Sequence, residues 1–340
     1  MVMGVGYNPR IVTDGLVLCL DAANPRSAPT TTIESAVVSS VTGSGPSYNV
    51  VYTTNVSAAR VGDKVNVEKR EAGAGTSSTV LSTYTYEITG LDRSLNQLTL
   101  TYESDTGSLG DDSPADLPSG GGSSGSPEIA PHDIVSLWID MKGGNNGTPT
   151  NGPTFSGDNG GSLVFDGAND YINVGNNSDL QITSEITLSA WIKGSPQSNR
   201  GIAGKYSATA AQRGYLIATQ QASPHNKITW YYQRVTNSFN VGDSVTSSLN
   251  VLDSNWHFIL CTFTPSVSAK IYIDGELNAT DTVDIQSAIA NNSTRFDIGI
   301  HDQSTATSFN GNISNVSVYN RALSAKEVLQ NYEATKGRYA

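Results

Sequence analysis

From residue 136 onward, short runs of apolar, β-branched and aromatic residues alternate with polar turns, which is the pattern of many short strands. Within Ser268–Gly275, Ile271 and Ile273 share one face of an extended segment, and Asp274 with Gly275 forms a tight hairpin turn. The pattern predicts strands at 162–165, 171–174, 186–193, 214–219, 227–232, 257–263, 269–273, 295–300 and 312–318.

One helix is predicted close to residue 340. Ser324 and Glu327 have the spacing of a capping box, in which each residue satisfies a free backbone N–H at the start of a helix. Val328, Leu329 and Tyr332 follow at helical spacing on one face. The fold class predicted is therefore all-β with a short C-terminal helix.

A change in composition divides the chain. Residues 103–131 are rich in Gly, Ser and Pro and almost without apolar residues, whereas the stretch before them has strand character again. We therefore expect three parts: a β-sandwich made of 1–27 plus 136–340, an inserted small all-β domain at 28–102, and an arm or linker at 103–135.

Composition and charge exclude several classes of partner. The net charge is −11, and Lys69–Arg70 is the longest basic cluster, so nucleic acid is not an expected partner. No apolar stretch is long enough to span a membrane, and residues 1–10 lack the features of a signal peptide, which predicts synthesis in a cytoplasm. Cys19 and Cys261 lie in apolar runs, which favours buried free thiols, although a disulfide stays open.

Five segments resemble, in order, the motifs of laminin-G-like (concanavalin A-like) jelly-roll domains. They are 162–172, 186–193, 255–258, 271–275 and 312–324. The resemblance implies a two-sheet jelly-roll sandwich that binds or builds rather than catalyses.

A narrower resemblance concerns Asp14–Pro25 and Trp138–Thr148. Both segments are similar to the opening of jelly-roll proteins in virions of tailed phages, notably cyanophages, but here more than one hundred residues separate them. This resemblance implies a non-enzymatic virion structural protein, either capsid decoration (cement) or a tail or fibre component. Its partners would be other virion proteins in a homo-oligomer or symmetric array, and its location the virion.

Catalysis is not expected. Glucanases that resemble this fold need paired acids about 5 Å apart. Asp281 and Asp284 come nearest, but three residues apart on an extended strand they face opposite sides. We expect no enzyme activity and no required cofactor.

Calcium is the metal that the sequence allows. Asp166, Asn169 and Asp170 crowd one turn, and hard cations bind several carboxylate and amide oxygens. Alternatively, the Asp-Gly sequence forms the turn itself and Asp170 accepts backbone N–H groups.

A glycan platform is the alternative functional hypothesis. Trp230 and Tyr232 belong to an aromatic run in which alternation sends some rings outward, where they would suit a lectin-like module for host-surface recognition. The competing interpretation places these rings in the sandwich core.

Overall fold

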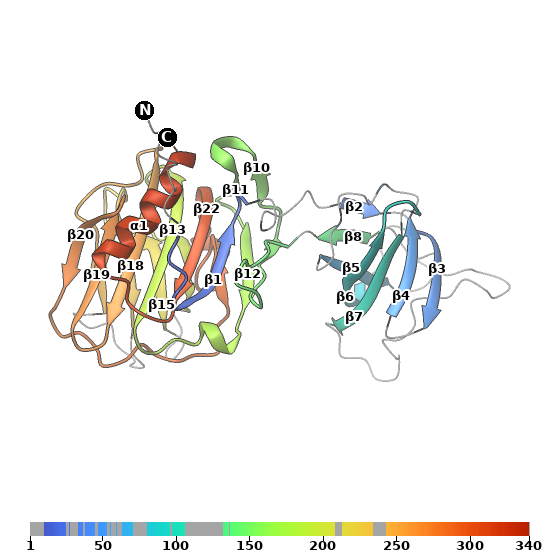
Figure 1. The fold of residues 1–340 in the computed structure, drawn as a ribbon, viewed down its shortest axis with the longest axis horizontal. Coiled ribbons are helices and arrows are strands. Elements are labelled where there is room, and N and C mark those ends of the chain that lie inside the picture. Colours follow the sequence, from blue (N-terminus) through green and yellow to red (C-terminus); the bar gives the residue numbers. More distant parts are fainter. Residues whose placement is uncertain are drawn as a thin grey trace, which may run out of the picture. The chain divides into compact units, whose positions relative to one another are not determined.

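The computed structural model contains two compact units of chain (Figure 1). The sandwich unit contains Met1–Ala28 and Trp138–Ala340, and the inserted unit contains Pro29–Leu137. The structure describes residues 10–24, 27, 33–36, 38–44, 47–52, 55, 59, 63–70, 80–95, 97–105, 132–135, 137–207, 213–233 and 243–339.

The first sheet of the sandwich unit, here called the β13 sheet, has the order β10-β11-β22-β13-β18-β19-β20. β22 pairs with β11 near its start and with β1 near its end, so both strands lie along the same edge of β22. Its strands are β1 (Leu16–Asp21), β10 (Thr154–Ser156), β11 (Ser162–Asp166), β13 (Ile186–Gly194), β18 (Trp256–Thr264), β19 (Ser268–Ile273), β20 (Glu276–Asp281) and β22 (Asn310–Tyr319).

The second sheet, the β14 sheet, has the order β17-β16-β15-β14-β21-β12-β9. Its strands are β9 (Thr148–Thr150), β12 (Tyr171–Gly175), β14 (Gly201–Lys205), β15 (Tyr215–Thr219), β16 (Ile228–Tyr232), β17 (Ser244–Thr246) and β21 (Phe296–Ile298). Alternate residues of both sheets form one buried core, such as Leu188 and Ile192 of β13 and Ile217 and Trp230 of the β14 sheet. This core removes from water the apolar positions that the alternation identified.

The predicted helix is present as α1 (Ala325–Thr335), and its capping box between Ser324 and Glu327 is confirmed. In Figure 1, α1 lies across the outer face of the β13 sheet, where Tyr332 stacks on Trp191 with ring centroids 5.9 Å apart. Short 3-10 helices are η1 (Asp158–Gly160), η2 (Ser178–Leu180), η3 (Thr305–Thr307) and η4 (Lys336–Arg338). No helix among the described residues has the length and apolar character needed to cross a membrane.

β1 and the segment that follows the insertion lie side by side. Leu20 and Asp140 form an antiparallel bridge, the Met141 N–H donates to the Cys19 carbonyl (2.8 Å), and the Cys19 N–H donates to Asp140 Oδ1 (2.9 Å). Cys19 and Cys261 are both buried free thiols, as expected, and burial raises the pKa of Cys19 to about 12.

The inserted unit is a single antiparallel sheet with the order β2-β8-β5-β6-β7-β4-β3. Its strands are β2 (Ile33–Ala36), β3 (Val38–Ser44), β4 (Ser47–Tyr52), β5 (Lys64–Arg70), β6 (Val80–Asp92), β7 (Gln97–Asp105) and β8 (His132–Val135). One face carries the buried side chains Tyr48, Val50, Tyr86, Ile88 and Leu98.

The expected arm at 103–135 differs from the structure at both ends. Residues 103–105 continue β7, and His132–Val135 form β8, which pairs with β5 and β2. The difference arises because strand pairing depends on distant partners, which a local count of Gly, Ser and Pro does not register. Residues 106–131 lie outside the described residues.

Candidate functional site

A polar groove lies where β13 ends and β22 begins. Gly194 and Gly311 are directly opposite each other in the ladder, and both line the groove. The groove encloses about 260 Å³. Gly311 has φ +142°, and a Cβ there would lie 2.3 Å from the Lys193 carbonyl oxygen, so the position requires glycine.

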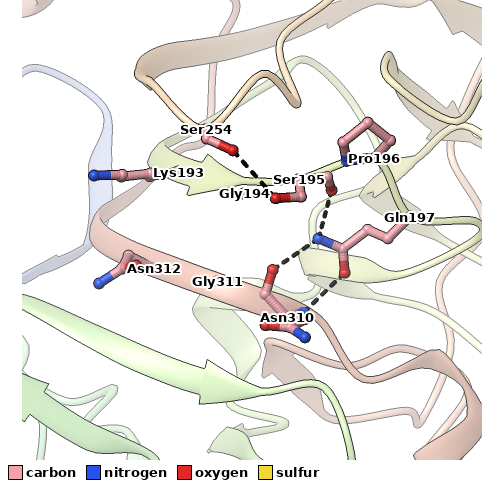
Figure 2. Close-up of a pocket in the computed structure, with 9 residues that line it drawn as sticks. All are labelled: Lys193, Gly194, Ser195, Pro196, Gln197, Ser254, Asn310, Gly311 and Asn312. Atoms are coloured by element: carbon pink, nitrogen blue, oxygen red, sulfur yellow. Dashed lines mark hydrogen bonds between the residues drawn. The ribbon is translucent and has the colours of Figure 1, made fainter.

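One wall of the groove is held in place by Gln197. Its Nε2 donates to the carbonyls of Asn310 (2.8 Å) and Ser195 (3.2 Å), and its Oε1 accepts from the Asn310 N–H (2.8 Å), as Figure 2 shows. Gln197 thus ties the loop after β13 to the start of β22. Because both ends of this amide are engaged, Gln197 shapes the groove rather than facing a ligand.

The opposite rim carries two hydroxyls. Ser195 Oγ and Ser254 Oγ lie 3.1 Å apart, and the Ser254 N–H donates to the Gly194 carbonyl (2.9 Å). Both serines are exposed, so the hydroxyl pair is open to a ligand from solvent.

Lys193 and Asn312 point to the same side of the groove in Figure 2, as expected for direct partners in an antiparallel ladder. Asn312 Nδ2 donates to Ser162 Oγ (3.1 Å). The Lys193 ammonium has no hydrogen bond or ion pair to any residue within the described ranges. Of the described residues that line the groove, Lys193 alone carries a charge.

Trp256 extends this row across a third strand, because it is the direct partner of Lys193 on β18. It is partly exposed, and its indole N–H donates to Asn159 Oδ1 (3.3 Å). The other tryptophans, Trp138, Trp191 and Trp230, are at most 3% exposed. Trp256 is therefore the tryptophan that can meet a ligand beside the groove.

The loop that carries Ser254 is anchored by His257. Its Nδ1 lies 2.8 Å from Asp274 Oδ2, and its Nε2 lies 3.2 Å from Asp253 Oδ1. The hydrogen bond to Asp274 raises the pKa of His257, and the Phe258 N–H also donates to Asp274 (2.8 Å). Asp274 thereby joins the start of β18 to the hairpin turn between β19 and β20.

Comparison with known proteins agrees with this architecture. Residues 166–329 match the family model Laminin_G_3, described as the concanavalin A-like lectin/glucanases superfamily. The sandwich unit is a concanavalin A-like jelly roll. No curated protein matches the chain.

Solved structures align with the chain at low identity. The binding domain of Paraclostridial Mosquitocidal Protein 1 aligns at 16% identity and a TM-score of 0.46, over 58% of this chain and 49% of that one. The botulinum neurotoxin serotype G binding domain aligns at 18% identity and a TM-score of 0.44, over 57% of this chain and 47% of that one. The chain thus spans about half the length of the structures that it matches.

The three residues of the calcium hypothesis lie together in one turn of the jelly roll. Asp170 Oδ2 accepts a hydrogen bond from the Asp166 N–H (3.0 Å), the kind of contact that the alternative interpretation of this turn describes. Asp166 Oδ1 accepts the N–H groups of Ala168 (2.7 Å) and Asn169 (3.4 Å). Burial raises the pKa of Asp170, with the Asp166 charge adding to the effect. Calcium at this turn stays a prediction.

The glycan platform at Trp230 and Tyr232 is wrong. Both side chains are 0% exposed and belong to the jelly-roll core, where Tyr232 donates to Asp281 Oδ2 (2.8 Å). The two rings share one face of β16, and that face packs against the β13 sheet. Trp256 is the tryptophan that reaches the surface beside the groove. Its pairing with Lys193 in the strand register places it there.

A second polar cluster surrounds Lys205, the last residue of β14. Its side chain is 2% exposed, and its ammonium donates to Asn176 Oδ1 (2.6 Å), the Asn292 carbonyl (2.6 Å), Asn292 Oδ1 (3.0 Å) and the Thr294 carbonyl. Burial lowers the pKa of Lys205 to about 8. This cluster has no local sequence signal, because the partners of Lys205 come from distant loops. Among the described residues, no group of three His, Cys, Asp or Glu side chains is arranged to hold a metal ion.

Proposed function

We propose that the protein is a non-enzymatic structural component of a tailed-phage virion, displayed on the particle as capsid decoration or as part of the tail or a fibre. The observation that carries the proposal is the pairing of β1 with the segment around Asp140. These are the two stretches that resemble one continuous opening of phage virion jelly rolls. In this chain they are separated in sequence by the inserted unit, yet adjacent in space.

The architecture suits a displayed, assembling protein. The jelly roll and the inserted sheet provide two modules for contact with neighbouring virion proteins or with further copies of the chain. The proposed role is non-enzymatic. Asp281 belongs to the pair that comes nearest to catalytic acids in the sequence, and it accepts a hydrogen bond from the hydroxyl of the buried Tyr232.

Mass spectrometry of purified virions tests this proposal, and immunogold labelling of the same particles locates the protein on the head or the tail. We expect the chain to co-purify with particles through a density gradient. Its presence in the lysate but not in particles would contradict the proposal.

The groove favours a second candidate function, a lectin-like module that recognises a host-surface glycan. Its hydroxyls and amides on a fixed backbone are the type of lining that orients a polar ligand. A glycan array probed with the protein and with a Ser195→Ala/Ser254→Ala double variant tests it. Binding that the double variant retains in full would place the ligand elsewhere.

A further inference from the structure

We propose that the groove binds a saccharide carrying an anionic group, with that group on the Lys193 ammonium and the sugar hydroxyls on Ser195, Ser254 and Asn310. This inference rests on the second candidate function and adds to it the class of glycan and the residue that selects it.

The charge of the groove lining favours an anionic ligand. The chain carries 31 acidic against 20 basic residues, yet the described lining of the groove contains one cation and no carboxylate. The nearby Asp253 and Asp166 are directed elsewhere, to His257 and to the N–H groups of their own turn. An anion in the groove therefore meets an ammonium with no competing partner, and a charge-assisted hydrogen bond is stronger than a neutral one.

The hydrogen-bonding capacity of the groove lining suits sugar hydroxyls. The bond between Ser195 and Ser254 uses one hydroxyl hydrogen, which leaves the other hydroxyl free to donate and leaves lone pairs free to accept. Asn310 is exposed, and its backbone N–H and carbonyl are both held by Gln197, so its position is fixed. Mixed donors and acceptors of this kind match the hydroxyls of a sugar ring.

The size of the groove suits a small ligand. About 260 Å³ lies just below the roughly 300–1,000 Å³ of sites for drug-sized ligands, so the groove suits a single ring with the rest of a glycan chain in solvent. Trp256 lies next to Lys193 on the same face of the sheet and extends the contact surface beyond the groove.

The test compares oligosaccharides of one backbone in three forms, neutral, carboxylated and sulfated, titrated into the full chain and followed by calorimetry and tryptophan fluorescence. We expect an anionic form to bind about tenfold more tightly than the neutral form, as one charge-assisted hydrogen bond provides. Whichever of the carboxylated and sulfated forms binds more tightly identifies the anionic group that the groove prefers. Lys193→Gln should remove this preference and leave neutral binding unchanged, whereas Lys193→Arg should keep it.

Lys270→Gln is the matched control, because Lys270 lies on β19 of the same sheet and likewise has no partner among the described residues. An equal loss in the Lys270 and Lys193 variants would overturn the proposal in favour of non-specific charge attraction. Equal binding of neutral and anionic forms, lost in the Ser195→Ala/Ser254→Ala variant, would overturn the anionic class but keep glycan binding. If none of the three oligosaccharide forms binds and none changes the melting temperature of the protein, both the anionic class of ligand and glycan binding at the groove are overturned.

Discussion

Two lysines of the jelly roll, Lys193 and Lys205, lie at or near the ends of consecutive strands and have opposite surroundings. Lys205 ends β14 and is buried, with its ammonium surrounded by oxygen acceptors of Asn176, Asn292 and Thr294. Lys193 is the penultimate residue of β13, is partly exposed, and has no partner among the described residues. The two residues are of the same type, but distant loops bring oxygen acceptors to Lys205 and, within the described ranges, none to Lys193.

This difference separates groups that maintain the fold from groups that remain available to a ligand. Lys205 joins the loop after β12 to the segment before β21. Its hydrogen bonds replace the hydrogen bonds with water that these acceptors give up when they are buried. Lys193 satisfies no buried acceptor. The comparison therefore predicts that loss of Lys205 affects stability and that loss of Lys193 affects binding.

Replacing Lys205 provides the largest expected effect. Lys205→Met leaves several buried oxygens without a donor, and we expect the free energy of unfolding to fall by about 3 kcal/mol. Urea unfolding followed by tryptophan fluorescence measures this change in the jelly roll, because all four tryptophans belong to the sandwich unit.

Lys193→Met is the matched control, and we expect a change within about 0.5 kcal/mol, as for other surface substitutions. Similar losses in the two variants would show that the two lysines do not differ in structural role.

The groove has its own structural requirement in Gly311. In Gly311→Ala the new Cβ would lie 2.3 Å from the Lys193 carbonyl at φ +142°, and we expect a loss of about 2 kcal/mol from strain and displacement of β13. Gly152→Ala is the control, since Gly152 also has positive φ but no atom within 4 Å of the added Cβ. If the two variants unfold at the same urea concentration, the close approach of β13 and β22 is not what requires glycine.

The pH dependence of stability distinguishes Lys205 from an ordinary surface lysine. Its pKa is about 8 in the folded state, below the usual 10.5. Between these values the unfolded chain binds more protons than the folded chain, so the free energy of unfolding rises as pH increases from about 8 to about 10.5. The difference in stability between wild type and Lys205→Met should therefore grow across this range. A difference that is constant with pH would contradict the low pKa.

The same contrast explains what could be predicted from the sequence. The core alternation and the helix with its capping box depend on neighbours close in sequence, and both are present. The jelly-roll class is predicted from the resemblance of five segments to a known family, and it is present as well. Trp230 and Tyr232 share one face of β16, but period-two alternation does not say which face another sheet will cover. The groove depends on the register of Gly194 with Gly311, and the Lys205 cluster depends on the pairing of Lys205 with Asn292. Only the folded chain brings such partners together.

The Asp166 turn extends the comparison to carboxylates and provides the smallest expected effect. Because Asp166 and Asp170 already accept backbone N–H groups, we expect calcium or EDTA to leave the melting temperature unchanged. Binding to the folded state at a hundred times the dissociation constant would instead add about 2.7 kcal/mol, which a thermal melt resolves. Asp170→Asn is the matched variant, because the amide oxygen can still accept the Asp166 N–H while the charge is lost. A calcium-dependent rise in melting temperature that this variant abolishes would establish a metal site, and these carboxylates would then resemble Lys193, available to a ligand, rather than Lys205.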